Sequence, residues 1–209
     1  MSLDDIFQSI LEYKTSDIAA LVQAEIDSGT DISVILNDGL IGAMDVVGEQ
    51  FGDGLLFIPE LLVAAETMKT GLEVLRPLLA DSDIKDRGTV AIGTVQGDLH
   101  DIGKNLVSMM VEGAGFTVVD LGVDVPADRF LRTAQETQPQ VIAMSALLTT
   151  SMPNMRRCIE LLSEADIDAK MIVGGAPVNQ RYADEIGADG YASDAAGAVR
   201  LIKNLVREA

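Results

Sequence analysis

The first half of the chain carries its apolar residues at helical spacing. From residue 1 to about 83 no run of β-branched residues alternates with polar ones. Turn residues interrupt the pattern at 28–31 and at 52–54, and Pro59 suits the first turn of a helix. The spacing predicts four helices, which would form a small bundle. Their expected ranges are 3–13, 16–28, 31–50 and 59–80.

The second half follows a different pattern. After the polar stretch 81–88, short β-rich apolar runs alternate with stretches of helical spacing, and several runs are apolar at consecutive positions. This predicts an α/β domain with a doubly wound, five-stranded parallel sheet of the Rossmann-like or flavodoxin-like type. The boundary is expected near residue 86, with a helical domain over 1–85 and the α/β domain over 86–209. The expected strands are 89–95, 116–123, 141–148, 170–178 and 190–193.

Small and polar residues gather where these strands end. Residues 97–103 follow the first strand, 145–150 end the third, and Gly174 and Gly175 end the fourth. In open α/β sheets ligands bind outside the carboxyl ends of the strands, because the loops converge there. A ligand site is therefore expected at this edge.

The charge and composition of the chain limit the classes of function that it can have. The 33 acidic residues outnumber the 15 basic ones and give a formal net charge of −18, which argues against binding nucleic acid or a membrane surface. The N-terminal MSLDDIF resembles no secretion signal, and no apolar run approaches the ~20 residues that span a bilayer. A cytoplasmic protein is expected. The lone cysteine, Cys158, excludes an internal disulfide and is expected as a buried thiol.

His100 is the only histidine of the chain, and it lies between two aspartates in the segment GTVQGDLHDIGKNLV. If this segment is extended just past the strand, Asp98 and His100 project to the same side. The carboxylate can then accept the Nδ1 proton and leave Nε2 as a metal ligand or a base.

Several chemistries compete for this arrangement. A zinc site would need a cluster of histidine and cysteine ligands that the chain lacks. A hydrolase triad of Ser145, His100 and Asp98 is conceivable, although Ser145 does not lie in a G-x-S-x-G elbow. Asp120 suits a dinucleotide ribose, but the loop does not match G-x-G-x-x-G, and the segment around Lys104 does not match a phosphate-binding P-loop. The fourth possibility is axial ligation of a large planar metal cofactor by Nε2.

Here the sequence resembles a known family. Asp98-x-His100-x-x-Gly103, then Ser145-x-Leu147 and then Gly174-Gly175 resemble the D-x-H-x-x-G…S-x-L…G-G signature of cobalamin-binding domains. Residues 46–79 are similar to the helical cap of cobalamin-dependent methionine synthase and of free-standing corrinoid proteins. The resemblance covers nearly the whole chain.

The resemblance implies roles for individual residues. His100 would be the lower axial ligand of cobalt in place of the cofactor's own base, with Asp98 as its hydrogen-bond partner and Ser145 next in the relay. Phe51, Ile58 and Leu61 would cover the upper face of the corrin, and Asn37 matches a polar cap contact. The remaining implied cobalamin contacts are Gly97, Asp101, Ile102, Gly103, Leu147, Thr149, Gly174, Gly175, Tyr191 and Ala195, most of them along the nucleotide tail.

The implied function is that of a methyl carrier. Such a protein shuttles a methyl group from a substrate:corrinoid methyltransferase to a corrinoid:acceptor methyltransferase, whose acceptor is tetrahydrofolate or a thiol, and a reductive activase would be a third partner. It would not be a complete enzyme alone, and the polar segment 81–88 would let the cap move. The alternatives are a cobalamin-dependent sensor, the cobalamin subunit of a carbon-skeleton mutase, and a flavodoxin-like domain without ligand.

Overall fold

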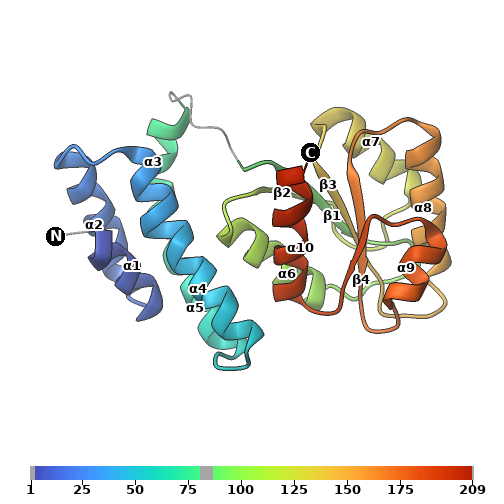
Figure 1. Cartoon of the computed structure of the whole chain (residues 1–209), viewed down its shortest axis with the longest axis horizontal. Coiled ribbons are helices and arrows are strands. Elements are labelled where there is room, and N and C mark those ends of the chain that lie inside the picture. Colours follow the sequence, from blue (N-terminus) through green and yellow to red (C-terminus); the bar gives the residue numbers. More distant parts are fainter. Residues whose placement is uncertain (1–2, 81–86, 209) are drawn as a thin grey trace. The chain divides into compact units, whose positions relative to one another are not determined.

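The computed structural model describes residues 3–80 and 87–208, which form two compact units. One unit contains the N-terminal helices and the other a sheet with helices on both faces (Figure 1). The boundary predicted near residue 86 falls at the end of 81–86, which lies outside the described residues, as does most of the predicted linker.

The helical unit follows the predicted helices with one exception. Its core contains Ile10, Ile18, Val22 and Leu75, all fully buried. The predicted helix 31–50 is wound in three parts, because its middle takes a π-helical turn in which the amide of Gly42 donates to the carbonyl of Asn37. The elements are α1 (Leu3–Leu11), α2 (Thr15–Asp27), α3 (Ile32–Val34), the π-helix η1 (Ile35–Ile41), α4 (Gly42–Gly52) and α5 (Ile58–Ala80).

The α/β unit has the predicted fold class. Its parallel strands lie in the order β2-β1-β3-β4-β5, with α6 and α10 on one face and α7, α8 and α9 on the other (Figure 1). The elements are β1 (Thr89–Thr94), α6 (Ile102–Gly113), β2 (Thr117–Asp120), α7 (Ala127–Thr137), β3 (Val141–Ser145), α8 (Pro153–Glu164), β4 (Lys170–Gly174), α9 (Gln180–Ile186), β5 (Gly190–Ala192) and α10 (Ala195–Glu208).

All five strands end earlier than predicted, β1 and β5 by one residue and the other three by at least three. β3 ends at Ser145, and the apolar residues Leu147 and Leu148 that suggested a longer strand lie in an exposed loop. β4 ends at Gly174 because the next residue, Gly175, has φ +118°, which no strand residue adopts. β2 ends at Asp120 for a similar reason, since Gly122 has φ +86°. These early ends create the loops that form the site.

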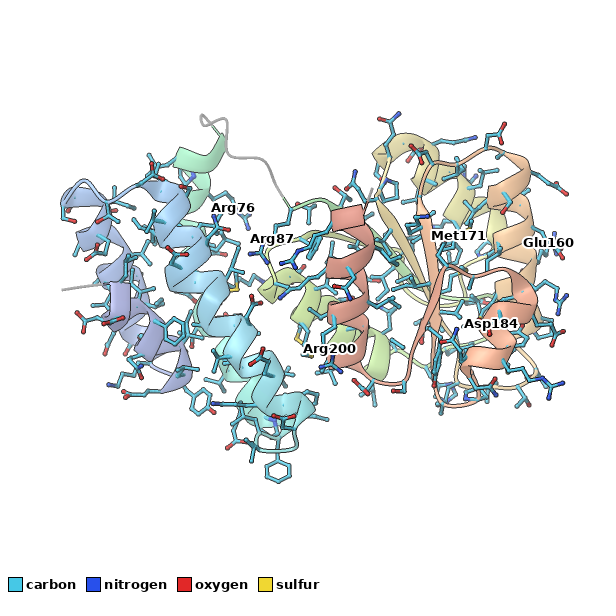
Figure 2. All side chains as sticks on the ribbon, in the orientation of Figure 1. Arg76, Arg87, Glu160, Met171, Asp184 and Arg200 are labelled. Carbon is cyan, nitrogen blue, oxygen red and sulfur yellow. The ribbon has the colours of Figure 1, made fainter. Side chains whose placement is uncertain are left out.

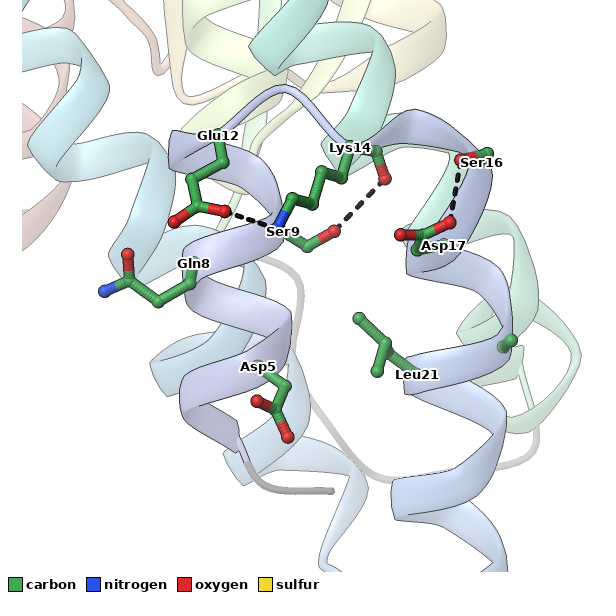
Figure 3. Close-up of a pocket in the computed structure, with 9 residues that line it drawn as sticks. Asp5, Gln8, Ser9, Glu12, Lys14, Ser16, Asp17 and Leu21 are labelled. Atoms are coloured by element: carbon green, nitrogen blue, oxygen red, sulfur yellow. Dashed lines mark hydrogen bonds and ion pairs between the residues drawn. The ribbon is translucent and has the colours of Figure 1, made fainter.

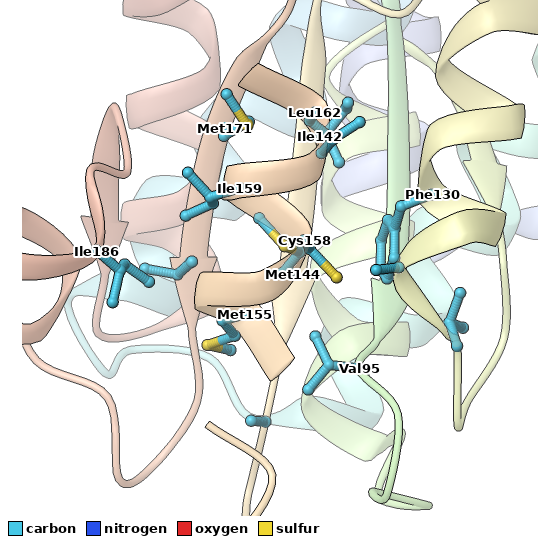
Figure 4. Close-up of a cluster of buried hydrophobic side chains, with 14 of the residues drawn as sticks. Val95, Phe130, Ile142, Met144, Met155, Cys158, Ile159, Leu162, Met171 and Ile186 are labelled. Carbon is cyan, nitrogen blue, oxygen red and sulfur yellow. The ribbon is translucent and has the colours of Figure 1, made fainter. Parts of the chain in front are cut away.

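The core of the α/β unit is apolar and its outer helix faces are charged. Phe130, Ile142, Met155 and Leu162 are fully buried between the sheet and the helices α7 and α8 (Figure 4). Glu160 on α8 and Asp184 on α9 are exposed, as the periodicity of these helices predicts (Figure 2). No helix within the described ranges is long and apolar enough to cross a membrane.

Candidate functional site

The site is built around His100 and Asp98, in the loop between β1 and α6. Nδ1 of His100 lies 2.7 Å from Oδ1 of Asp98, and the backbone amide of His100 donates to the same oxygen at 3.1 Å. The Asp98 side chain is fully buried, whereas that of His100 is 53% exposed. The predicted pairing is therefore present, with the carboxylate inside and the imidazole facing outward.

The second oxygen of Asp98 is held by the loop that follows β3. Oδ2 accepts hydrogen bonds from the amides of Leu147 and Leu148 at 2.7 and 3.0 Å, and from the hydroxyl of Ser151 at 2.8 Å. The prediction that Ser145 is the hydroxyl next to Asp98 was wrong, because the strand ends at Ser145 and the turn after it brings Ser151 to the carboxylate. A run of hydroxyl residues, 149–151, was the available signal, but spacing alone does not select among them.

These contacts fix the charge of Asp98 and the tautomer of His100. Burial raises the pKa of Asp98, but the hydrogen bonds from His100, Leu147, Ser151 and Leu148 outweigh it and hold the pKa well below its ordinary value. The carboxylate is therefore ionised, and an ionised carboxylate only accepts hydrogen bonds. The proton of neutral His100 then lies on Nδ1, and Nε2 carries a lone pair. No described residue makes a hydrogen bond to Nε2.

Side chains from three neighbouring segments fix the backbone of this loop. The hydroxyl of Thr94, which is fully buried, donates to the carbonyl of His100 at 2.9 Å. Asp124 accepts from the amide of Gly97 at 2.7 Å, and the side chain of Asn154 donates to the carbonyl of Gln96. Neither Thr94 nor Asn154 was singled out from the sequence, because ordinary strand and helix residues carry no motif.

Exposed apolar side chains lie in the segments next to the Asp98–His100 pair. Ile102 is 81% and Leu99 72% exposed, and Leu147 and Leu148 also face solvent at this edge of the sheet. Single exposed apolar side chains are common, but four in or next to the two loops that hold Asp98 and His100 offer apolar area that a planar group could cover. The arrangement thus fits a metal cofactor with a large flat face, whose metal would take Nε2.

The predicted glycines differ in their surroundings. A Cβ on Gly103 would meet no atom within 4 Å, so open space lies beside the start of α6. A Cβ on Gly174 would lie 3.1 Å from the carbonyl oxygen of Ala192, and one on Gly175 only 1.9 Å from that of Ala146. Gly175 is therefore required by the backbone itself, whereas Gly103 leaves room for a ligand.

The other predicted contacts of the α/β unit lie at the same edge or at the next strand. Asp101 accepts from the side chain of Asn105, and Thr149 is exposed in the loop after β3. Tyr191 lies in β5 and is half-buried, and Ala195 begins α10 and is buried. Register joins Ser145 to Gly174, so the strand-end motifs are neighbours in space. Their contacts with a cofactor stay predictions.

The predicted cap contacts lie in the helical unit. Ile58 is exposed and Phe51 is half-buried, so both have accessible side-chain surface that could contact a cofactor. Leu61 is fully buried, so in this structure it has no surface with which to cover a corrin. Asn37 lies in η1 and donates to the carbonyl of Ser33.

A surface pocket lies between α1 and α2 (Figure 3). Several of its polar groups pair with one another: Lys14 with Glu12 at 2.5 Å, Ser9 with the carbonyl of Lys14, and Ser16 with Asp17. None of the predicted site residues lines it. Within 3–80 and 87–208, no three His, Cys, Asp or Glu side chains come together as an all-protein metal site.

Comparisons with known proteins agree with this geometry. Two family models, each described as a B12 binding domain, match residues 88–200 and residues 2–76. A trimethylamine corrinoid protein of Methanosarcina mazei is 45% identical over 199 residues, which cover 93% of this chain and 91% of the relative. A corrinoid protein of Desulfitobacterium hafniense is 40% identical over 209 residues, covering 98% of this chain and 97% of the relative.

A solved structure shows the same likeness over both units. A chain of the methanol:cobalamin methyltransferase complex from Methanosarcina barkeri is 32% identical, with a TM-score of 0.88 over 98% of this chain and 79% of the other. The predicted family and the predicted cofactor, cobalamin, are thereby confirmed. The chain belongs to the family of B12-binding corrinoid proteins.

Proposed function

We propose that this chain is a methyl carrier that holds cobalamin with His100 as the lower axial ligand of cobalt, in place of the cofactor's own base. When bound, the cofactor supplies the cobalt atom that accepts and gives up the methyl group. The chain itself supplies the ligand, its partners and the binding surface. One observation carries this proposal: Nδ1 of the only histidine is held by a buried, ionised carboxylate, while the imidazole is half exposed and Nε2 has no hydrogen-bond partner among the described residues.

The Asp98–His100 pair has a defined chemical task. With its proton on Nδ1, the neutral imidazole presents the Nε2 lone pair that a metal ligand needs. The ionised Asp98 keeps the Nδ1 proton in the same 2.7 Å hydrogen bond whether or not Nε2 binds a metal. The protein therefore keeps the imidazole proton on Nδ1 and leaves Nε2 for the metal.

A methyl carrier needs two methyltransferases as partners, and an activase to keep its cofactor reduced. One is a substrate:corrinoid methyltransferase and the other a corrinoid:acceptor methyltransferase that passes the methyl group to tetrahydrofolate or a thiol, with a reductive activase as a third. The similarity to a chain of a methanol:cobalamin methyltransferase complex supports the first partner. Relatives named for trimethylamine and dimethylamine support methylated amines as the methyl source.

The test is reconstitution with hydroxocobalamin, gel filtration and reduction to Co(II). We expect the corrinoid to comigrate with the protein and the Co(II) electron paramagnetic resonance spectrum to show coupling to one nitrogen. Labelling with ¹⁵N-histidine should turn the coupling from three lines into two, since His100 is the only histidine.

His100→Ala is the matching variant. It should remain folded, because the imidazole is half exposed, and it should lose the histidine coupling. A wild-type protein that emerges colourless from gel filtration would refute cobalamin binding. A histidine-labelled coupling that is absent from the wild type would refute His100 as the ligand.

A further inference from the structure

A buried lysine lies just after the histidine loop, residues 95–101 between β1 and α6, and has no part in the function described so far. The side chain of Lys104 is 2% exposed, and its ammonium lies 2.7 and 2.6 Å from the two oxygens of Asp120 and 2.7 Å from Oδ1 of Asn105. These three acceptors match the three donors of the ammonium. Lys104 therefore makes a complete set of hydrogen bonds inside the protein.

This lysine lies where local electrostatics disfavours it. Lys104 is the third residue of α6, which begins at Ile102, and the N-terminal end of a helix carries a partial positive charge. A buried cation there is unfavourable unless a carboxylate neutralises it. Residues that conflict with their local environment are typical of functional sites, where another requirement outweighs the conflict.

The contacts of Lys104 join three segments. Asp120 is the last residue of β2, and its Oδ1 also accepts from the amide of Gly122 at 2.9 Å. Asn105 passes the connection back to the histidine loop, because its backbone amide donates to the carbonyl of Asp101 at 2.7 Å and its side chain donates to the carboxylate of Asp101 at 3.1 Å. Asp101 directly follows His100.

The histidine is thus held from both sides. Thr94, at the end of β1, holds the carbonyl of His100, and the Lys104–Asp120 pair holds the first turn of α6 that follows it. We propose that Lys104 and Asp120 form a positioning pair that sets the direction in which His100 presents Nε2. This proposal rests on the proposed function, in which Nε2 ligates cobalt.

The two residues of the pair differ in burial, so each can be replaced with a different expected cost. The side chain of Asp120 is 44% exposed, so water solvates its carboxylate when the lysine is removed. Lys104→Met replaces the ammonium by an unbranched apolar chain of similar length, so this variant should fold. Asp120→Asn keeps one oxygen acceptor for Lys104 and Gly122, but it replaces the other oxygen by an NH₂ donor and removes the charge that neutralises the buried ammonium. It serves as the second variant.

A matched control lies at the opposite edge of the sheet. Lys170, at the start of β4, pairs with Asp189 at 3.3 Å, and both side chains are partly exposed. Lys170→Met makes the same chemical change without touching the carboxyl ends of the strands. It separates a general effect of charge removal from an effect on the histidine loop.

The first measurement uses the protein without cofactor. Because His100 is the only histidine, ¹⁵N-detected NMR of the imidazole gives one set of signals. The wild type and Lys170→Met should show a proton on Nδ1 in its hydrogen bond to Asp98. In Lys104→Met these signals should move toward those of a mobile imidazole that exchanges between tautomers, and Asp120→Asn should shift them in the same direction.

The second measurement uses cobalamin-loaded protein in the Co(II) state. Lys104→Met should lower the ratio of histidine-ligated to histidine-free cobalt about tenfold, which is the low end of the effect of losing an outer partner of a metal ligand. Unchanged imidazole signals and an unchanged ratio in Lys104→Met would overturn the proposal. If Lys104→Met fails to fold, the same two readouts in Asp120→Asn decide. If the wild type binds no cobalamin, the proposed function fails, and the NMR comparison still decides whether the pair positions His100.

Discussion

The hydroxyl of Ser151 donates a 2.8 Å hydrogen bond to Oδ2 of Asp98, across 53 residues of sequence. This contact extends the Asp98–His100 pair into a relay of three side chains that ends in the loop after β3. Ser151 helps to keep the buried carboxylate ionised, and the carboxylate in turn holds the proton of His100 on Nδ1. The loops after β1 and β3 therefore both contribute to the tautomer of the histidine.

Asp98→Asn should reverse the tautomer of His100. The amide oxygen of asparagine would accept from Leu147, Leu148 and Ser151, which turns its NH₂ group toward Nδ1 of His100. Nδ1 then accepts and the imidazole proton moves to Nε2, where it blocks metal ligation. The ¹⁵N signals of the single histidine report the change directly.

Asp101→Asn is the control for this prediction. Asp101 is the other aspartate next to His100, but its carboxylate accepts from Asn105. Its substitution should leave the proton on Nδ1. A proton that stays on Nδ1 in Asp98→Asn would show that Oδ1 of Asp98 does not decide the tautomer.

Ser151→Ala should remove one of the hydrogen bonds that stabilise the buried carboxylate of Asp98. The variant removes one of three donors to Oδ2 without adding bulk, so we expect a loss of about 1.5 kcal/mol in the free energy of unfolding at neutral pH. Urea unfolding measures it. Ser145→Ala is the matched control, since the hydroxyl bonded to Asp98 belongs to Ser151, and it should cost distinctly less. Equal losses in the two variants would contradict the assignment of Ser151.

The stability of the protein should fall in acid because of Asp98. Its pKa in the folded protein lies below that of an unfolded aspartate, about 3.9, so the unfolded chain binds more protons in the interval between the two values. The stabilisation is complete above the unfolded value and is lost as the pH falls below about 4 toward the folded value.

Unfolding curves of the wild type and Asp98→Asn between pH 7 and pH 3 test this linkage. At neutral pH the variant should be less stable by on the order of 2 kcal/mol, because charged hydrogen bonds are replaced by neutral ones. The difference should shrink as the pH falls. A constant difference over the whole range would mean that Asp98 has an ordinary pKa.

Two glycines predicted from the same motif should respond in opposite ways. Gly175→Ala combines a φ of +118° with a Cβ 1.9 Å from the carbonyl oxygen of Ala146, so we expect a loss of about 3 kcal/mol in the free energy of unfolding. Gly103→Ala has open space and lies in a helix, so it should stabilise the apoprotein by up to about 1 kcal/mol.

Cofactor titration gives Gly103→Ala its second readout. If the space beside Gly103 receives part of the cofactor, the added methyl group lowers the affinity for cobalamin while the apoprotein gains stability. An affinity equal to that of the wild type would remove Gly103 from the predicted contacts.

The fold could be predicted from periodicity because each half obeys one rule. Helical spacing in the first half and consecutive apolar residues in the second reflect which faces of each element are covered, and this depends mainly on local pattern. The ends of elements were predicted less well. Leu147 and Leu148 are typical strand residues in the sequence, but in the structure they follow the end of β3 and their amides donate hydrogen bonds to Asp98.

Local patterns were enough to place one histidine, an aspartate two residues before it and a glycine three residues after it at the carboxyl end of a parallel strand. This pattern is local, because an extended segment places alternate side chains on one side. The folded chain was needed to show which hydroxyl reaches Asp98, which carboxylate pairs with the buried Lys104, and which glycine the backbone requires. Those contacts join Ser151, Asp120 and Ala146 to residues far along the chain, and the packing of neighbouring strands sets them.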